Sequence, residues 1–218
     1  MPTAKSQQQR IIFRVMKYFV TAIGTDSGKT LVSAILCDAL LADYWKPIQA
    51  GLPRDTDVVR ALINNKKTIL HPEAYLLKTA ASPHAAARID QTMIRMTDIQ
   101  IPKTENTLII EGAGGCLVPL NDSDLVIDLI GSFKSEVIVI SNHYLGSINH
   151  TLLTFEALKK RNLPLKGLIF NGDPNEESER IILHHTKLKC LLRIKKEPEI
   201  NPDVVQKYAS LLKSNWNG

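Results

Sequence analysis

The segment Tyr18-Phe19-Val20-Thr21-Ala22-Ile23-Gly24-Thr25-Asp26-Ser27-Gly28-Lys29-Thr30 decides the fold of this chain. Its first five residues are mostly apolar or β-branched, which predicts a short buried strand over residues 18–22. A glycine-containing loop follows, and apolar residues then recur at helical spacing from Thr30 to Leu41. The sequence therefore predicts a strand, a loop and a helix in direct succession, which is the building unit of α/β proteins.

The same alternation of strands and helices continues toward the C-terminus. Further strands are predicted over residues 44–45, 107–111, 136–141, 165–170 and 190–194, and further helices over residues 125–133, 148–160, 176–185 and 202–212. The strands are rich in Val and Ile and show little polar alternation, which is typical of a parallel sheet buried on both faces. We therefore expect an α/β fold with a mostly parallel central sheet and helices on both faces.

Two regions depart from this pattern. Residues 51–103 are polar, contain four prolines, and are predicted to form loops and short helices. Residues 1–16 are predicted to form a disordered N-terminal arm, followed by a single domain at residues 17–218. The arm lacks the apolar core and cleavage site of a signal peptide, and no apolar run approaches the ~18 residues that cross a bilayer. A cytoplasmic protein without a membrane partner is expected.

The composition argues against several classes of function. The 218 residues carry a net charge of +5, and 44% of them are hydrophobic, as in an ordinary globular domain. The basic residues form only short clusters mixed with apolar residues, so we expect no nucleic-acid partner; only the net charge favours a nucleic-acid-binding module. The cysteines Cys37, Cys116 and Cys190 are widely spaced, which argues against structural zinc and against disulfides.

The loop from Gly24 to Thr30 has the composition of a phosphate-binding loop. Its glycines let backbone N–H groups face an anion, and the following helix adds positive charge at its N-terminus. Lys29 can then reach the phosphates and the Thr30 hydroxyl can ligate Mg²⁺. The standard motif begins with glycine where this chain has Ile23, so a simple helix-capping turn is the alternative. The position between a buried strand and a helix favours phosphate binding.

Three charged residues follow predicted strands or lie in the loops beyond them. Glu111 ends a buried strand, where a carboxylate is costly unless it binds a metal or hydrogen-bonding partners. Asp57 is a second candidate, with helix capping as an equally good alternative. Lys46 precedes Pro47 at a strand end and could stabilise negative charge there, although a surface lysine is the simpler interpretation when it is taken alone. Because ligands bind at the carboxyl edge of parallel sheets, these residues are expected to meet.

Taken together, these features resemble the dethiobiotin synthetases. The resemblance runs from Lys17 to about Leu212 and is carried by segments in a fixed order. They are Tyr18 to Thr21 leading to Gly28-Lys29-Thr30, then Trp45-Lys46-Pro47-Ile48-Gln49-Ala50-Gly51, Asp57, Ser82-Pro83-His84-Ala85-Ala86, Glu111-Gly112-Ala113-Gly114-Gly115, Pro119-Leu120 with Asp128-Leu129, Leu145-Gly146-Ser147-Ile148-Asn149-His150, and Asn171.

The resemblance implies a reaction and a fold. Members of this family have the P-loop NTPase fold and act as homodimers on 7,8-diaminopelargonic acid, CO₂ or bicarbonate, and ATP with Mg²⁺. One amine captures CO₂ as a carbamate, ATP phosphorylates the carbamate, and the second amine closes the ureido ring of dethiobiotin in biotin biosynthesis. An enzyme of this kind works mainly by positioning and by neutralising charge.

The resemblance also implies roles for individual residues. Lys29 and Lys46 would be catalytic. The nucleotide would contact Thr25, Asp26, Ser27, Gly28, Lys29, Thr30 and Asn171, the last through its base. Mg²⁺ would be held by Thr30, Asp57 and Glu111. The substrate would contact Ala50 and the helix start formed by Gly146, Ser147 and Asn149, which would serve the partner subunit's site.

The chain departs from the family pattern at three positions. Ala22 stands where the loop begins with Gly, Ala50 stands where Ser or Thr is common, and Lys195 replaces a Pro near the base. These departures bear on nucleotide selectivity and affinity. Partitioning ATPases share the broad fold but place a second Lys at the start of the loop, which is missing here. Amide-forming ligases for cobyrinic-acid-like substrates normally carry a glutaminase domain, for which 218 residues leave no room.

Overall fold

The computed structural model describes residues 15–216, so most of the arm expected at residues 1–16 lies outside the described part. A seven-stranded sheet forms the centre, in the order β4-β2-β6-β1-β7-β8-β9, and each of its strand pairs is parallel. The strands are β1 (Lys17–Ala22), β2 (Asp43–Trp45), β4 (Leu70–His71), β6 (Leu108–Gly115), β7 (Glu136–Asn142), β8 (Leu165–Asn171) and β9 (Cys190–Ile194).

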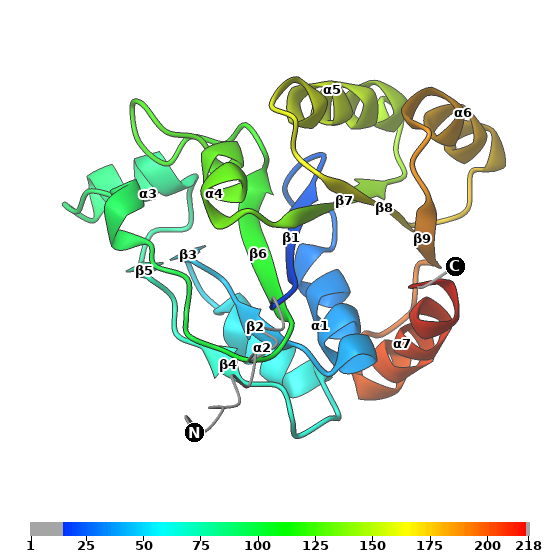
Figure 1. The fold of residues 1–218 in the computed structure, drawn as a ribbon, viewed down its shortest axis with the longest axis horizontal. Helices are drawn as coiled ribbons and strands as arrows, with labels where there is room; N and C mark the ends of the chain where they lie inside the picture. The colour runs from blue at the N-terminus through cyan, green and yellow to red at the C-terminus, as the bar shows by residue number, and fades with distance from the viewer. Residues whose placement is uncertain (1–14, 217–218) are drawn as a thin grey trace, which may run out of the picture.

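Helices cover both faces of this sheet (Figure 1). On one face pack α1 (Lys29–Leu40), α2 (Asp55–Leu62) and α7 (Pro202–Trp216), and on the other pack α4 (Val126–Phe133), α5 (Ser147–Lys160) and α6 (Glu176–Thr186). Successive residues of a strand point to opposite faces. Accordingly Tyr18 and Val20 belong to one apolar cluster and Phe19 to the other. The predicted α/β fold with a parallel sheet between two helical layers is therefore confirmed.

The strands and helices predicted outside residues 46–103 are confirmed, with ends that shift by a few residues. Between them the structure contains α2, η1 (Met96–Asp98), α3 (Pro83–Ile89) and a second, two-stranded parallel sheet. This sheet pairs β3 (Ile48–Ala50) with β5 (Tyr75–Leu77) and was not predicted. Both strands have three residues, which is too short for a periodic pattern, and Lys46-Pro47 separates β3 from β2.

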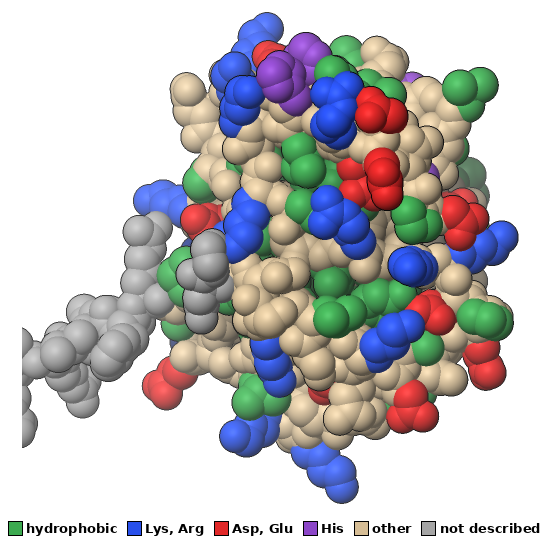
Figure 2. Space-filling view, turned by 90° about the vertical axis from the view of Figure 1, so that its right-hand side faces the viewer, with side chains coloured by type: hydrophobic (Ala, Val, Ile, Leu, Met, Phe, Trp, Pro, Cys, Tyr) green, Lys and Arg blue, Asp and Glu red, His purple; other side chains and the backbone are tan. Residues whose placement is uncertain are grey.

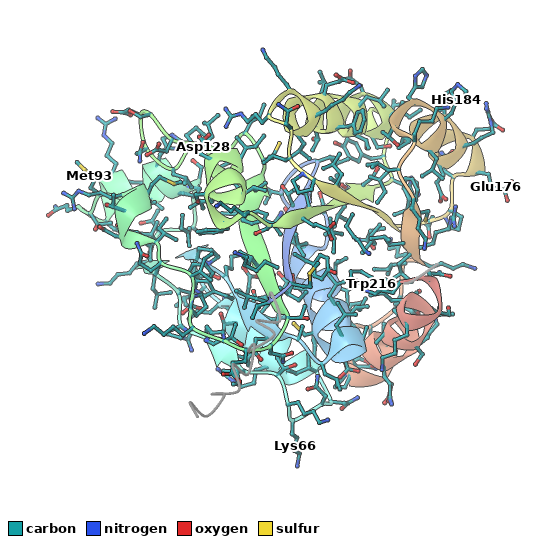
Figure 3. The ribbon with its side chains drawn as sticks, in the orientation of Figure 1. Lys66, Met93, Asp128, Glu176, His184 and Trp216 are labelled. Atoms are coloured by element: carbon teal, nitrogen blue, oxygen red, sulfur yellow. The ribbon has the colours of Figure 1, made fainter. Side chains whose placement is uncertain are left out.

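The charged side chains of both signs are intermixed on the visible surface (Figure 2). On the face that Figure 2 shows, Lys and Arg side chains alternate with Asp and Glu and form no continuous basic area. Figure 3 places His184 at the outer side of α6, where it is exposed, and Trp216 at the end of α7. The Trp216 ring packs edge-on against Tyr18 at a centroid distance of 5.0 Å. Within residues 15–216 no helix has the length and apolarity that spanning a membrane requires.

Candidate active site

The loop between β1 and α1 is held in shape by its own residues. The Ser27 hydroxyl donates to the Gly24 carbonyl at 3.2 Å, and the Lys29 ammonium donates to the same carbonyl at 3.0 Å. Gly28 has φ of +88°, a conformation that side chains disfavour, and a Cβ there would collide with the Asn171 amide. Asn171, at the end of β8, donates to the Ser27 carbonyl at 2.9 Å. The loop is therefore fixed both internally and from β8.

A cluster of charged side chains lies beside this loop. Lys46 follows β2, and its ammonium contacts the Asp55 carboxylate and the Glu111 Oε1 atom, the latter at 3.1 Å. The Thr30 hydroxyl is 2.8 Å from Asp55 Oδ1 and 3.1 Å from Glu111 Oε1. The second oxygen of Glu111, Oε2, accepts from the Tyr44 hydroxyl at 3.0 Å. Side chains of α1, β2, α2 and β6 thus meet near the carboxyl edge of the sheet, and they include the predicted Lys46 and Glu111.

The two lysines of the site differ in their electrostatics. Burial lowers the pKa of Lys29 below its ordinary value, and the Glu111 carboxylate opposes only part of that shift. Burial alone would also lower the pKa of Lys46, but the adjoining Glu111 and Asp55 carboxylates outweigh it and raise that pKa. Lys46 is consequently held as a cation at neutral pH, and it balances the two acidic side chains that it contacts.

These side chains line a pocket of about 800 Å³. Such a volume suits a nucleotide together with a small substrate, because ligand sites commonly span 300–1,000 Å³. The predicted residues in its wall are Thr25, Asp26, Gly28, Lys29, Thr30, Lys46, Ala50 and Glu111. The rest of the wall is formed by β3, by residues 51–53 and Asp55 in the segment that follows it, by residues 80–83, and by Ala113, Gly114 and Val118.

Other predicted residues lie outside this wall. Ser27 is buried within the loop and Asn171 lies behind it. Gly146, Ser147 and Asn149 lie at the start of α5, where Gly146 has φ of +107°. They do not line the pocket of their own chain.

The prediction for Asp57 requires a correction. Its carboxylate is about half exposed and pairs with Arg54 at 2.7 Å and with Arg60 at 2.6 Å, so it does not reach the pocket. Asp55, the first residue of α2, occupies the position expected of Asp57. The sequence contains a signal that distinguishes Asp55 from Asp57. Asp57 lies three residues from an arginine on either side, a spacing that is typical of ion pairs on a helix surface.

The pocket edge carries three oxygen donors, from Thr30, Asp55 and Glu111, next to a phosphate-type loop. Among the described residues, no group of three or more His, Cys, Asp or Glu side chains converges as a metal cage. Two carboxylates and one hydroxyl are nevertheless a suitable set for Mg²⁺, which keeps several waters and takes further oxygens from phosphates. In the structure the Lys46 ammonium, itself a cation, contacts two of these donors.

The fold and the loop together define a protein of the P-loop NTPase class. Solved structures with the same fold include the septum site-determining protein MinD complexed with Mg-ADP from Pyrococcus horikoshii, with a TM-score of 0.58, 14% identity and 93% of each chain covered. A ParA family ATPase from Chlorobium tepidum matches with a TM-score of 0.55 and 11% identity over 94% of this chain and 95% of that one. At such low identity these likenesses concern the fold alone.

Sequence comparison narrows the class to a family. Residues 16–204 match the family model described as AAA domain. The ATP-dependent dethiobiotin synthetase BioD of Cytophaga hutchinsonii is 61% identical over 202 residues, covering 92% of this chain and 98% of the relative. The protein of the same name from Christiangramia forsetii is 50% identical over 194 residues, covering 88% and 93%. The chain therefore belongs to the ATP-dependent dethiobiotin synthetase family, and the resemblance found in its sequence is confirmed.

Proposed function

We propose that this chain uses ATP to convert 7,8-diaminopelargonic acid and CO₂ into dethiobiotin, ADP and phosphate. The observation that carries the proposal is the pocket, in which two buried lysines and three oxygen donors converge beside the phosphate-type loop. Family membership supplies the substrates, because the named relatives are ATP-dependent dethiobiotin synthetases.

The proposed reaction proceeds in three steps. An amine of the substrate attacks CO₂ and loses a proton, which gives a carbamate. A carbamate oxygen attacks the γ-phosphorus of ATP, and ADP leaves. The second amine attacks the carbonyl carbon of the mixed anhydride, phosphate leaves with the bonding electrons, and loss of the amine's proton completes the ring. Each step moves negative charge among oxygens, so fixed cations near those oxygens favour it.

The positions of Lys29 and Lys46 match this need. Lys29 lies in the loop, where its ammonium can exchange the Gly24 carbonyl for phosphate oxygens. Lys46 lines the same pocket as Lys29 and Ala50, where its charge can stabilise the carbamate and the transferring phosphoryl group. Both side chains are nearly buried, and the weak screening inside such a site strengthens their electrostatic effect.

We further propose that Thr30, Asp55 and Glu111 hold Mg²⁺, with Asp55 in place of Asp57. When bound, the ion would neutralise charge on the nucleotide phosphates. The chemistry of the donors supports this assignment: all three are oxygens, and Thr30 lies within 3.1 Å of both carboxylates. Family membership supports the proposal that Asn171, which anchors the phosphate-type loop to β8, also contacts the nucleotide base.

A homodimer is part of the proposal. The start of α5 offers backbone N–H groups after Gly146, and such a helix end attracts carboxylates. The preceding Leu145 is fully exposed and Tyr144 is 44% exposed, which is consistent with a covering surface from a second copy. We propose that Gly146, Ser147 and Asn149 recognise the substrate carboxylate in the partner subunit's site. Light scattering of the purified protein, with and without the diamine, measures the mass of the assembly.

The decisive test is phosphate release from purified protein with 7,8-diaminopelargonate, bicarbonate, Mg²⁺ and ATP, combined with mass detection of dethiobiotin. We expect phosphate and dethiobiotin to form in equal amounts, and phosphate release to stop when the diamine is omitted. A 7-amino or 8-amino monoamine analogue serves as control, because it can form a carbamate but cannot close the ring. ATP hydrolysis at a rate that is independent of the diamine and of bicarbonate would contradict the proposal.

The assignment of Asp55 rather than Asp57 to the proposed Mg²⁺ site leads to two linked predictions. Asp55→Asn is expected to lower kcat by roughly 10²-fold, since it removes one oxygen charge from the proposed Mg²⁺ site and one partner of Lys46. Asp57→Asn is the matched control two residues away, and it is expected to stay within about twofold of the parent because it alters only surface ion pairs. The same phosphate-release assay measures both. A larger loss from Asp57→Asn than from Asp55→Asn would reverse the assignment.

A further inference from the structure

Glu111 is a buried carboxylate whose two oxygens have different surroundings. Its side chain has no exposed surface. Oε1 is shared by the Thr30 hydroxyl and the Lys46 ammonium, each at 3.1 Å. Oε2 accepts a hydrogen bond from the Tyr44 hydroxyl at 3.0 Å. One oxygen therefore faces the pocket and the other is turned into the core.

The strand register explains why Tyr44 reaches this oxygen. Tyr44 of β2 pairs with Ile109 of β6, so the two side chains share a face of the sheet. Glu111 lies two residues beyond Ile109, on the same face and about 6.6 Å further along the strand. A tyrosine side chain is long enough to span that step, and its ring is fully buried among the apolar residues packed under α1. A phenylalanine would fill the same space but would leave Oε2 without this donor.

We propose that Tyr44 is a positioning residue for the metal site: its hydroxyl holds Glu111 so that Oε1 is presented to Mg²⁺ beside Thr30 and Asp55. The inference rests on the Mg²⁺ assignment in the proposed function. A carboxylate that binds a metal through one oxygen needs its other oxygen fixed, because rotation about the terminal bond would otherwise misdirect the ligand. Tyr44 supplies that restraint from a rigid strand and touches no substrate.

The test compares ADP binding with and without Mg²⁺ by calorimetry, so that no turnover is needed. In Tyr44→Phe we expect ADP affinity in EDTA to equal that of the parent. The gain in affinity on adding Mg²⁺ should fall by about tenfold, in line with the loss of a hydrogen bond to a metal ligand. In turnover, the Mg²⁺ concentration for half-maximal rate should rise by a similar factor, while kcat at saturating Mg²⁺ stays within about twofold.

Two further variants make the result specific. Tyr75→Phe is the matched control, because the Tyr75 hydroxyl also donates to a carboxylate, Asp98, at 3.0 Å, but neither residue lines the pocket. It should leave the Mg²⁺ dependence unchanged. Tyr44→Met removes the hydroxyl while filling the core with a flexible apolar chain, and it should reproduce the loss seen in Tyr44→Phe. In a Glu111→Gln background, Tyr44→Phe should cause no additional loss.

The outcomes separate this inference from the proposed function. An unchanged Mg²⁺ gain in the folded Tyr44 variants would overturn the positioning role. A fall in ADP affinity of equal size with EDTA and with Mg²⁺ would overturn it too, because it would indicate general damage to the loop. Absence of diamine-dependent turnover in the parent protein would contradict the proposed reaction, while the calorimetric comparison would still decide the role of Tyr44.

Discussion

Lys29→Ala is expected to lower kcat for diamine-dependent phosphate release by roughly 10³-fold or more, the scale of losing a cation that stabilises a transferring phosphoryl group. The Lys29 side chain is almost fully buried, at 8% exposure, and it is held inside the loop by the Gly24 carbonyl. No other lysine in the pocket wall belongs to this loop, so no neighbour can take its place. The measurement is the phosphate-release assay at saturating ATP and Mg²⁺.

A matched control separates local charge from net charge. Lys66→Ala makes the same chemical change on an exposed residue that does not line the pocket and that Figure 3 places at the periphery of the molecule. It should leave turnover unchanged within about twofold, as is usual for a surface substitution. Lys29→Arg should also be strongly impaired, because a planar guanidinium does not fit where an ammonium is enclosed. Retention of more than a tenth of the parent rate in Lys29→Ala would contradict the phosphate-binding role.

Lys46→Met is expected to affect both activity and stability. It removes the cation between Asp55 and Glu111, which leaves a fully buried carboxylate without its ion partner. Breaking a buried pair in this way costs about 3–5 kcal/mol of unfolding free energy. The free energy can be obtained from urea unfolding in EDTA. Phosphate release should fall by roughly 10²-fold or more, because the charge that opposes the carbamate is lost.

Bound ligand should offset part of this destabilisation. Addition of Mg²⁺ with ADP is expected to raise the urea midpoint of Lys46→Met, since a ligand that binds only the folded state stabilises it. Combining Lys46→Met with Glu111→Gln should recover stability relative to Lys46→Met alone, because the unpaired charge is removed. Equal urea midpoints for the parent and Lys46→Met in EDTA would show that the pair contributes nothing.

Much of the fold follows from simple patterns. Runs such as Glu136 to Ser141 are long and apolar enough to identify a buried parallel strand, and the loop at Gly24 to Thr30 lies between β1 and α1, as its pattern predicts. Strand order does not follow in the same way. The contact between Tyr44 and Glu111 depends on β2 lying next to β6, although 62 residues separate the end of β2 from the start of β6. Local periodicity contains no information on that adjacency.

The choice between Asp55 and Asp57 shows the same limit at finer scale. Residues that are two positions apart on a helix are rotated by about 200° around its axis. The side chain of Asp55 therefore faces the sheet while that of Asp57 faces solvent. Which one faces inward depends on where α2 begins after Pro53. That start is fixed by Gln49, whose side chain accepts from the Asp55 backbone N–H at 3.0 Å and donates to the Gly51 carbonyl at 3.1 Å. Both contacts depend on the path of the loop between β3 and α2, which hydrophobic periodicity does not describe.

The central position of β1 has a consequence during synthesis of the chain. Among the described strands, β1 is the first to be synthesised, yet its two neighbours, β6 and β7, begin only at Leu108 and Glu136. At about 5–20 residues per second, its apolar edges wait on the order of 5–20 s for a partner. Both edges of β1 thus stay unpaired during that time, and the loop that follows β1 reaches its final setting only after most of the chain has been translated.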